Sequence, residues 1–284
     1  MKKEAVGEAM LDAEKKVTKK AYAKINLTLE ILGTRRGDGY HDIASVMHKA
    51  PCLYDEVTVL VSQKLCGVTL SCDKDVCAPS DNLAYRAAKA YIDLCAEKNV
   101  SVPGVNIDIR KNIPAGAGLA GGSSDAAAVL DALNEALGVL SDGEIFEIAL
   151  SLGSDVPFCL EKHTCALCTG RGETIKELSP LKNTEIKILV PDSPLYTKAV
   201  YSEYDRLYGD NYTKSKSLEM AKALENGEDT QSLAKYMCND FEEICVRQCP
   251  EIAVLCEKLK GEGYFSQMSG SGCAVFGIRS TGNN

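Results

Sequence analysis

No stretch of this 284-residue sequence is apolar over the roughly 20 residues that a membrane-spanning helix needs. An excess of positive charge is also missing, because 40 acidic side chains outnumber 32 basic ones and leave a formal net charge of −8. A nucleic acid or a membrane surface would favour a basic face, so the composition argues against either partner. An acidic protein can still bind phosphate where it gathers hydrogen-bond donors locally.

The first 20 residues lack the apolar segment of a secretory signal and are rich in Lys and Glu. We interpret residues 1–18 as a charged extension and expect a cytoplasmic protein. In a reducing compartment the 13 cysteines are expected to be thiols rather than disulfides. Cys165 and Cys168 form a CxxC pair within a predicted strand, where positions three apart face opposite sides, so we expect no metal site there.

Strict alternation of apolar and polar residues over 21–32 predicts a half-buried strand, with Lys24 and Asn26 on its polar face. Residues 33–39 are expected to form a loop. Further strands are expected at 56–61, 67–72, 105–109, 164–169, 185–190 and 273–278, and helices at 81–98, 123–137, 141–152, 217–225, 230–247 and 251–260. Alternating strands mixed with helices favour an α+β fold with mixed or antiparallel sheets covered by helices. The polar stretch around Pro180 suggests a division into domains 19–178 and 179–284.

A glycine-rich segment joins the predicted strand 105–109 to the helix that we expect to begin at Ser123. Glycines let the backbone turn its N–H groups toward one point, and the helix start adds unpaired N–H groups and a positive dipole end. Together they predict a phosphate site, and a glycine-rich helix entry without a ligand is the less favoured alternative. The segment consists of Pro114, Ala115, Gly116, Ala117, Gly118, Leu119, Ala120, Gly121, Gly122, Ser123 and Ser124.

Two better-known nucleotide motifs do not fit this segment. Its glycines spell GxGxxG, but the dinucleotide fingerprint belongs to an early βαβ unit, whereas this loop is mid-chain and two predicted helices follow it. The Walker A motif fails because Gly122 occupies the position of its lysine.

Asp155 follows the helix-ending Gly153, and its carboxylate could accept the proton of a substrate hydroxyl. Lys24 could hold that carboxylate ionised and stabilise a transferring phosphoryl group. Taken singly, such an Asp is usually a turn former and such a Lys usually faces solvent, and the sequence does not show that the two meet.

Tyr40 and His41 follow a glycine turn and suit stacking on, and hydrogen bonding to, a planar base. An ordinary packed Tyr and a surface His are the alternative. Near the C-terminus, the small residues of 268–272 precede a strand and permit a close backbone approach to the first glycine loop or to a ligand, although a simple tight turn has the same composition.

Taken together, these segments resemble the GHMP kinase superfamily. The loop 114–124, followed by Asp125-Ala126-Ala127, is similar to its phosphate-binding motif, and residues 268–272 are similar to its C-terminal glycine motif. Within the superfamily, the segments 23–27, 38–41, 152–158 and 170–173 are closest to the branch that phosphorylates a cytidine diphosphate-linked methylerythritol in the non-mevalonate isoprenoid pathway. The resemblance covers about residues 19–278.

The resemblance implies a two-domain kinase with an interdomain active-site cleft that uses ATP and magnesium to phosphorylate the 2-hydroxyl of that small-molecule substrate. Asp155 would be the general base and Lys24 its charged partner. Asn26 would line the substrate pocket, and Tyr40, His41 and Tyr201 would recognise the cytosine.

A GHMP kinase for an amino-alcohol or sugar, and a non-catalytic nucleotide sensor of the same fold, are alternative functions, and either a monomer or a homodimer is compatible with the sequence. The family often has Asn at the position of Asp125. An acid near a helix N-terminus is favoured by the helix dipole, but it would repel phosphate if it faced the loop, so we expect this side chain to point away from the loop.

Overall fold

The computed structural model describes residues 14–35, 40–74, 77–192, 195, 197–208 and 215–282. Residues 1–13 and 36–39, which belong to the predicted extension and loop, lie outside the described residues. The chain groups into two compact units, each made of several stretches. Among the described residues, those within 1–23, 53–113 and 121–160 form unit 1, and those within 24–52, 114–120 and 161–284 form unit 2. The predicted division after residue 178 remains a prediction.

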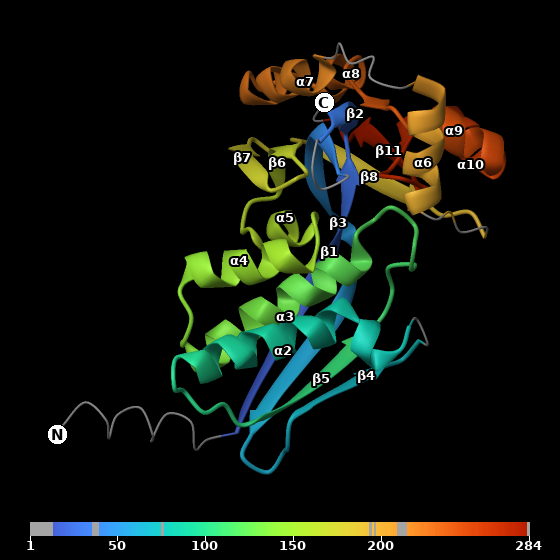
Figure 1. Cartoon of the computed structure of the whole chain (residues 1–284). Coiled ribbons are helices and arrows are strands. Elements are labelled where there is room, and N and C mark those ends of the chain that lie inside the picture. The colour runs from blue at the N-terminus through green and yellow to red at the C-terminus, as the bar shows by residue number, and fades with distance from the viewer. Residues whose placement is uncertain are drawn as a thin grey trace. The chain divides into compact units, whose positions relative to one another are not determined.

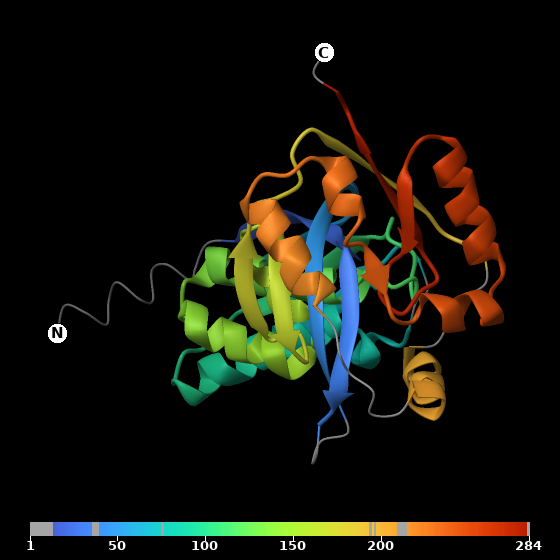
Figure 2. The ribbon, with the colours of Figure 1, turned by 90° about the horizontal axis from the view of Figure 1, so that it is seen from above.

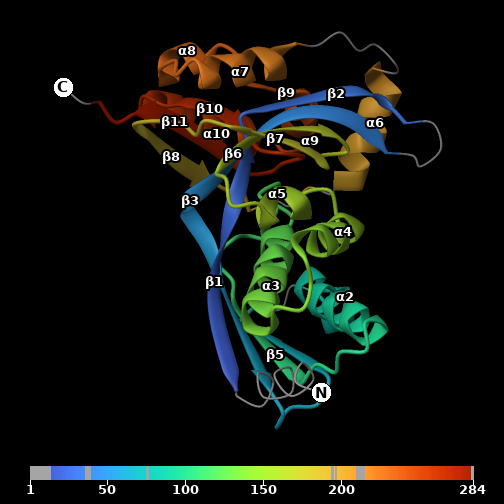
Figure 3. The ribbon, with the colours of Figure 1, turned by 90° about the vertical axis from the view of Figure 1, so that its left-hand side faces the viewer.

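In unit 1, helices cover one face of a small mixed sheet (Figure 1; Figure 3). Strand β5 (Gly104–Arg110) pairs antiparallel with the second half of β3 (His41–Ser62) and parallel with β4 (Val68–Cys72), while the first part of β1 (Lys15–Asn26) belongs to the same unit. The helices are α2 (Leu83–Glu97), α3 (Gly121–Leu137), α4 (Asp142–Leu152) and α5 (Val156–Leu160), with a 3₁₀ turn, η1, at Pro79–Asp81. The inward side chains of β3 and β5 pack with α2 and α3 to form its core.

Local signals set the helix boundaries of unit 1. Ser141 and Glu144 form a capping box at the start of α4, which agrees with the helix predicted at 141–152. Helix α3 ends at Leu137, before Gly138 with its φ of +66°. It begins at Gly121, two residues before the predicted start, so two of the four loop glycines belong to its first turn.

Unit 2 contains two groups of strands. The first half of β3 pairs antiparallel with β2 (Thr28–Thr34) and with β6 (Cys165–Gly170), β6 pairs with β7 (Thr174–Leu178), and the short β9 (Cys238–Asn239) runs parallel to β2. A separate antiparallel sheet has the order β10 (Phe265–Met268), β11 (Val275–Ser280), β8 (Thr184–Leu189). The helices are α6 (Thr197–Tyr208), α7 (Lys216–Glu225), α8 (Thr230–Ala234), α9 (Glu242–Gln248) and α10 (Glu251–Gly261). Helix α10 lies along β10 and β11 (Figure 2).

Two sequence predictions change, and several elements were not predicted. The single helix expected at 230–247 is wrong, because the chain forms α8, then β9, then α9. Strands β7 and β10 and helices α5 and α6 had no predicted counterpart. The strand expected at 21–32 is interrupted after Asn26, and its polar face is buried rather than exposed. The α+β class is confirmed.

All 13 cysteines are free thiols. Within the described part of the chain, no group of three or more His, Cys, Asp or Glu side chains is arranged to hold a metal ion. The same residues include no helix that is both long and apolar enough to cross a membrane.

Candidate active site

The first half of the glycine loop, residues 114–120, belongs to unit 2 and is held there through its carbonyl groups. The Ala117 carbonyl accepts from the Ala274 amide at 3.0 Å, the Gly118 carbonyl from the Ser269 hydroxyl at 3.2 Å, and the Leu119 carbonyl from the Lys24 amide at 3.0 Å. Among the described residues, no backbone amide of 115–120 donates a hydrogen bond. The carbonyl groups of the loop are therefore bonded within unit 2, whereas its backbone N–H groups are available as hydrogen-bond donors.

The second half of the loop is the first turn of α3 in unit 1. Gly122 is exposed, and an added Cβ would meet nothing closer than 3.8 Å. The Ser124 hydroxyl is buried and lies 2.6 Å from the Tyr22 carbonyl, to which it donates. Of the two serines, Ser123 is the half-buried one, so its hydroxyl and the amides of this turn are the better phosphate donors.

Lys24 and Asn26 lie together in a buried polar network of unit 2. The Lys24 ammonium donates to Asn26 Oδ1 at 2.7 Å, and Asn26 Nδ2 donates to the Ser45 hydroxyl at 2.7 Å. Ser45 in turn donates to the Thr28 carbonyl at 2.6 Å. Lys24 is 3% exposed and Asn26 is 1% exposed. Lys24 is therefore not an ordinary strand lysine that faces solvent. A buried ammonium held by a fixed amide is preorganised to meet negative charge.

Asp155 belongs to unit 1, where it is half-buried between α4 and α5. Its carbonyl accepts from the Cys159 amide at 3.1 Å, so it stands at the entry of the short helix that the sequence did not predict. Lys24 and Asp155 belong to different units, and their pairing remains a prediction.

The structure brings His41 and Tyr201, two of the three candidate base-recognition residues, into contact within unit 2. The His41 and Tyr201 rings have centroids 5.0 Å apart, and His41 Nε2 lies 2.6 Å from the Asp205 carboxylate on α6. Tyr40 is 50% exposed, with the Arg171 guanidinium 4.8 Å from its ring centroid. Asp205 and Arg171 were missed from the sequence, since α6 was not predicted and nothing local links either residue to Tyr40 or His41.

The C-terminal glycine motif, residues 268–272, lies directly against the first glycine loop. An added Cβ at Gly118 would come within 2.3 Å of the Ser269 carbonyl oxygen, which confirms the predicted close approach. Asn239 Nδ2 donates to the Met268 carbonyl at 2.9 Å and to the Gly270 carbonyl at 2.8 Å. Asn239 thus fixes the motif that packs on the loop, a role that no local sequence signal indicated.

Comparisons with known proteins identify the family to which this fold belongs. The family model described as GHMP kinases N terminal domain matches residues 82–163, and the one described as GHMP kinases C terminal matches 220–282. A relative from Desulfotalea psychrophila, named 4-diphosphocytidyl-2-C-methyl-D-erythritol kinase, is 40% identical over 91% of this chain and 84% of its own length.

Two solved structures have a similar fold. A crystal structure of 4-(cytidine 5'-diphospho)-2C-methyl-D-erythritol kinase gives a TM-score of 0.74 at 32% identity and covers 92% of this chain and 90% of its own. A homoserine kinase from Cytophaga hutchinsonii gives 0.71 at 16% identity over 94% of this chain and 85% of its own, a likeness that concerns the fold alone.

Proposed function

This chain belongs to the 4-diphosphocytidyl-2-C-methyl-D-erythritol kinase family of the GHMP kinases, and we propose that it transfers the γ-phosphoryl group of ATP to the 2-hydroxyl of that cytidyl substrate. The reaction belongs to the non-mevalonate isoprenoid pathway and would take place in the cytoplasm. The identity of 40% over 91% of the chain supports this activity over that of another small-molecule kinase of the same fold.

The observation that carries the proposal is the division of hydrogen bonds in the glycine loop. Three consecutive carbonyls, those of residues 117–119, are engaged by the fold, while the amides of 115–120 donate no bond among the described residues. These amides lead directly into the N-terminus of α3, whose first N–H groups have no partner within the helix. A row of free donors that ends in a positive helix dipole suits the phosphate tail of a nucleotide.

The remaining assignments follow from the chemistry of each group. Asp155 is proposed as the general base for the substrate hydroxyl, and Lys24 as the cation that stabilises the transferring phosphoryl group. Asn26 lines the substrate pocket, and Tyr40, His41 and Tyr201 are proposed to recognise the cytosine.

Magnesium would neutralise the phosphate oxygens during transfer. The described residues include no cluster of side chains that could hold the magnesium ion. We therefore propose that the nucleotide and water supply most of its ligands.

A phosphoryl-transfer assay tests the proposal. Purified protein is incubated with ATP, magnesium and a panel that contains the cytidyl substrate, homoserine and galactose, and ADP release is followed. We expect turnover of the cytidyl substrate alone. Phosphorylation of homoserine or galactose, with no phosphorylation of the cytidyl substrate, would reject the proposed function.

The Asp155→Asn variant tests the general base. It should lose at least about 100-fold in kcat while its affinity for ATP stays near that of the wild type. The matched control is Asp93→Asn, an exposed aspartate on α2 that should behave as wild type. Unchanged kcat in Asp155→Asn would remove this residue from its role.

A further inference from the structure

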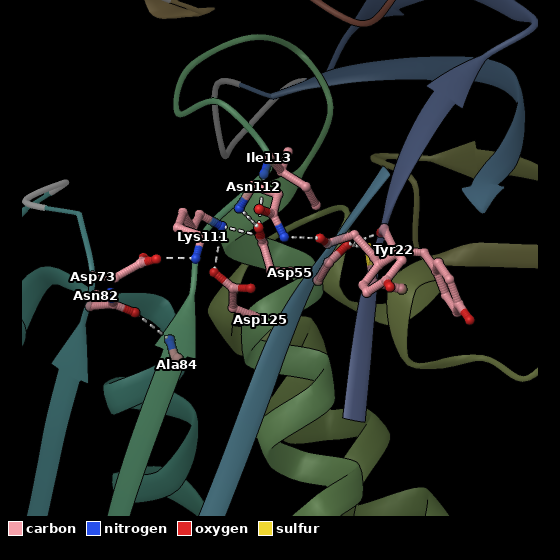
Figure 4. Close-up of polar contacts among 12 residues, drawn as sticks. Tyr22, Asp55, Asp73, Asn82, Ala84, Lys111, Asn112, Ile113 and Asp125 are labelled. Carbon is pink, nitrogen blue, oxygen red and sulfur yellow. Dashed lines mark hydrogen bonds and ion pairs between the residues drawn. The ribbon is translucent and has the colours of Figure 1, made fainter. Parts of the chain in front are cut away.

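Three charged residues that the proposed reaction does not use are buried together in unit 1. Asp55 is 0% exposed, Lys111 5% and Asp125 2%. The Lys111 ammonium donates to Asp55 Oδ2 at 2.5 Å and to Asp125 Oδ2 at 2.6 Å, so one lysine bridges two carboxylates (Figure 4). Removing three charges from water is costly, and replacing such a group by apolar side chains often stabilises a protein. Stability alone therefore does not explain this cluster.

One side of the cluster fixes the chain where it enters the glycine loop. Lys111, Asn112 and Ile113 follow strand β5 and directly precede Pro114. Asp55 Oδ1 accepts from the Asn112 amide at 2.5 Å and from the Ile113 amide at 2.8 Å (Figure 4). The Asp55 carboxylate thus holds the last two amides before the loop as well as the lysine.

The other side of the cluster lies where the chain leaves the loop. Asp125 comes one turn into α3, four residues after Gly121. An added Cβ at Gly121 would come within 2.9 Å of Ile113 Cγ2 and 3.0 Å of Lys111 Nζ. The two ends of the loop therefore pack against each other. Lys111 connects them, because its ammonium binds both the Asp55 and the Asp125 carboxylate. The Asp125 side chain turns to this lysine, inside the core of unit 1.

We propose that Asp55, Lys111 and Asp125 form a buried clamp that joins the entry and the exit of the glycine loop and so positions its amides for the phosphates of ATP. The three are positioning residues, since they act through the backbone of 112–113 and the first turn of α3. The inference rests on the proposed function, because it takes ATP as the ligand of the loop.

The charge of the clamp gives it a pH signature. With both carboxylates ionised the clamp carries one net negative charge at the base of an anion site, and a proton on Asp125 makes it neutral. The pKa of Asp125 is raised to about 7, chiefly because the carboxyl is buried; the Lys111 ammonium counteracts part of this rise, and the Asp55 carboxylate adds to it. The titratable groups that face Asp125 are Lys111 from the end of β5 and Asp55 from β3. Asp125 Oδ1 is buried without a partner among the described residues, as suits a group that is neutral part of the time.

Nucleotide binding by the full-length protein tests the clamp. Affinity for a non-hydrolysable ATP analogue with magnesium is measured by calorimetry between pH 6 and pH 8.5. Asp55→Asn places an amide NH₂ where the Lys111 ammonium needs an acceptor, and we expect it to weaken binding about tenfold or more while the KM of the cytidyl substrate stays unchanged.

Asp125→Asn keeps the shape of the side chain and fixes it neutral. Its affinity should match that of the wild type at pH 6 and exceed it severalfold at pH 8.5. Because both proteins bind the same nucleotide, ionisation of the ATP analogue cancels in their ratio. The control is Asp131→Asn, an exposed aspartate on the same helix, whose ratio to wild type should not change with pH.

If the wild type binds the ATP analogue tightly and Asp55→Asn binds it as tightly as the Asp131→Asn control does, the clamp is overturned. The proposed function would still stand in that case. A constant ratio between Asp125→Asn and wild type across the pH range would equally overturn it, and this comparison decides if Asp55→Asn does not fold. A wild type that binds no ATP analogue would overturn the proposed function itself.

Discussion

Gly118 is the position where the structure makes the strongest steric demand on the glycine loop. Its φ is +76°, and an added Cβ would lie 2.3 Å from the Ser269 carbonyl oxygen, 2.9 Å from that of Gly272 and 3.0 Å from the Gly272 amide. All three atoms belong to the backbone, so no side-chain rotation can relieve the contact. Gly118→Ala should therefore push the C-terminal glycine motif away from the loop.

The magnitude follows from two additive costs. A positive φ costs an alanine about 1–2 kcal/mol, and overpacking against fixed atoms adds about 1–3 kcal/mol. Gly116 provides the matched control, because its φ is +67° but an added Cβ would meet nothing within 4 Å. Gly116→Ala should show only the first cost, and Gly118→Ala the sum, about 2–5 kcal/mol.

Thermal unfolding without nucleotide measures the difference. A loss of 1 kcal/mol in unfolding free energy lowers the Tm of a large domain by about 2–4 °C. The Tm of Gly118→Ala should therefore lie several degrees below that of Gly116→Ala. Equal midpoints for the two variants would refute the packing of the C-terminal motif on the loop.

Three further variants test other parts of the account. Asp205→Asn removes the charge that orients the His41 ring, and should raise the KM of the cytidyl substrate about 3–10-fold with the KM of ATP unchanged in steady-state assays; an equal rise in both would contradict it. Asn239→Asp turns two N–H donors into acceptors that face carbonyl oxygens, and should cost about 2–4 kcal/mol in urea unfolding, where a loss below 1 kcal/mol would count against it. Burial lowers the pKa of His48 to about 4, and its Nε2 accepts from the Leu181 amide at 3.1 Å, so the folded protein resists protonation there. Because the unfolded chain takes up that proton near pH 6.5, stability should fall by on the order of 3 kcal/mol from pH 6.5 to pH 4, and His48→Gln should lose this dependence; an unaltered pH profile would exclude His48 as its source.

Features with a local cause could be predicted from the sequence. Alternation alone places β5, and the Ser141–Glu144 pair alone places the start of α4, because period and capping depend on neighbours in the chain. The loop 114–124 was recognisable for the same reason, since glycine content and position before a helix are local properties. The division of this loop between two compact units could not be predicted, because it depends on distant contacts.

Features that depend on distant residues could not be predicted. The polar face of residues 24–30 looks solvent-facing in the sequence, but distant partners bury it. The Glu30 carboxylate accepts from the Lys216 and Ser217 amides at the start of α7, 186 and 187 residues away. The helix expected at 230–247 breaks because β9 pairs with β2, which the local helical pattern does not reveal. The clamp likewise joins residues that are far apart in the sequence: Asp55 in β3, Lys111 directly after β5, and Asp125 in α3.

A crystal structure with a non-hydrolysable ATP analogue and the cytidyl substrate tests the central claim most directly. The account predicts that the triphosphate lies on the amides of residues 115–123, with the 2-hydroxyl within hydrogen-bonding distance of the Asp155 carboxylate and the Lys24 ammonium beside the γ-phosphate. A triphosphate bound away from this loop, or a substrate hydroxyl remote from Asp155, would contradict it.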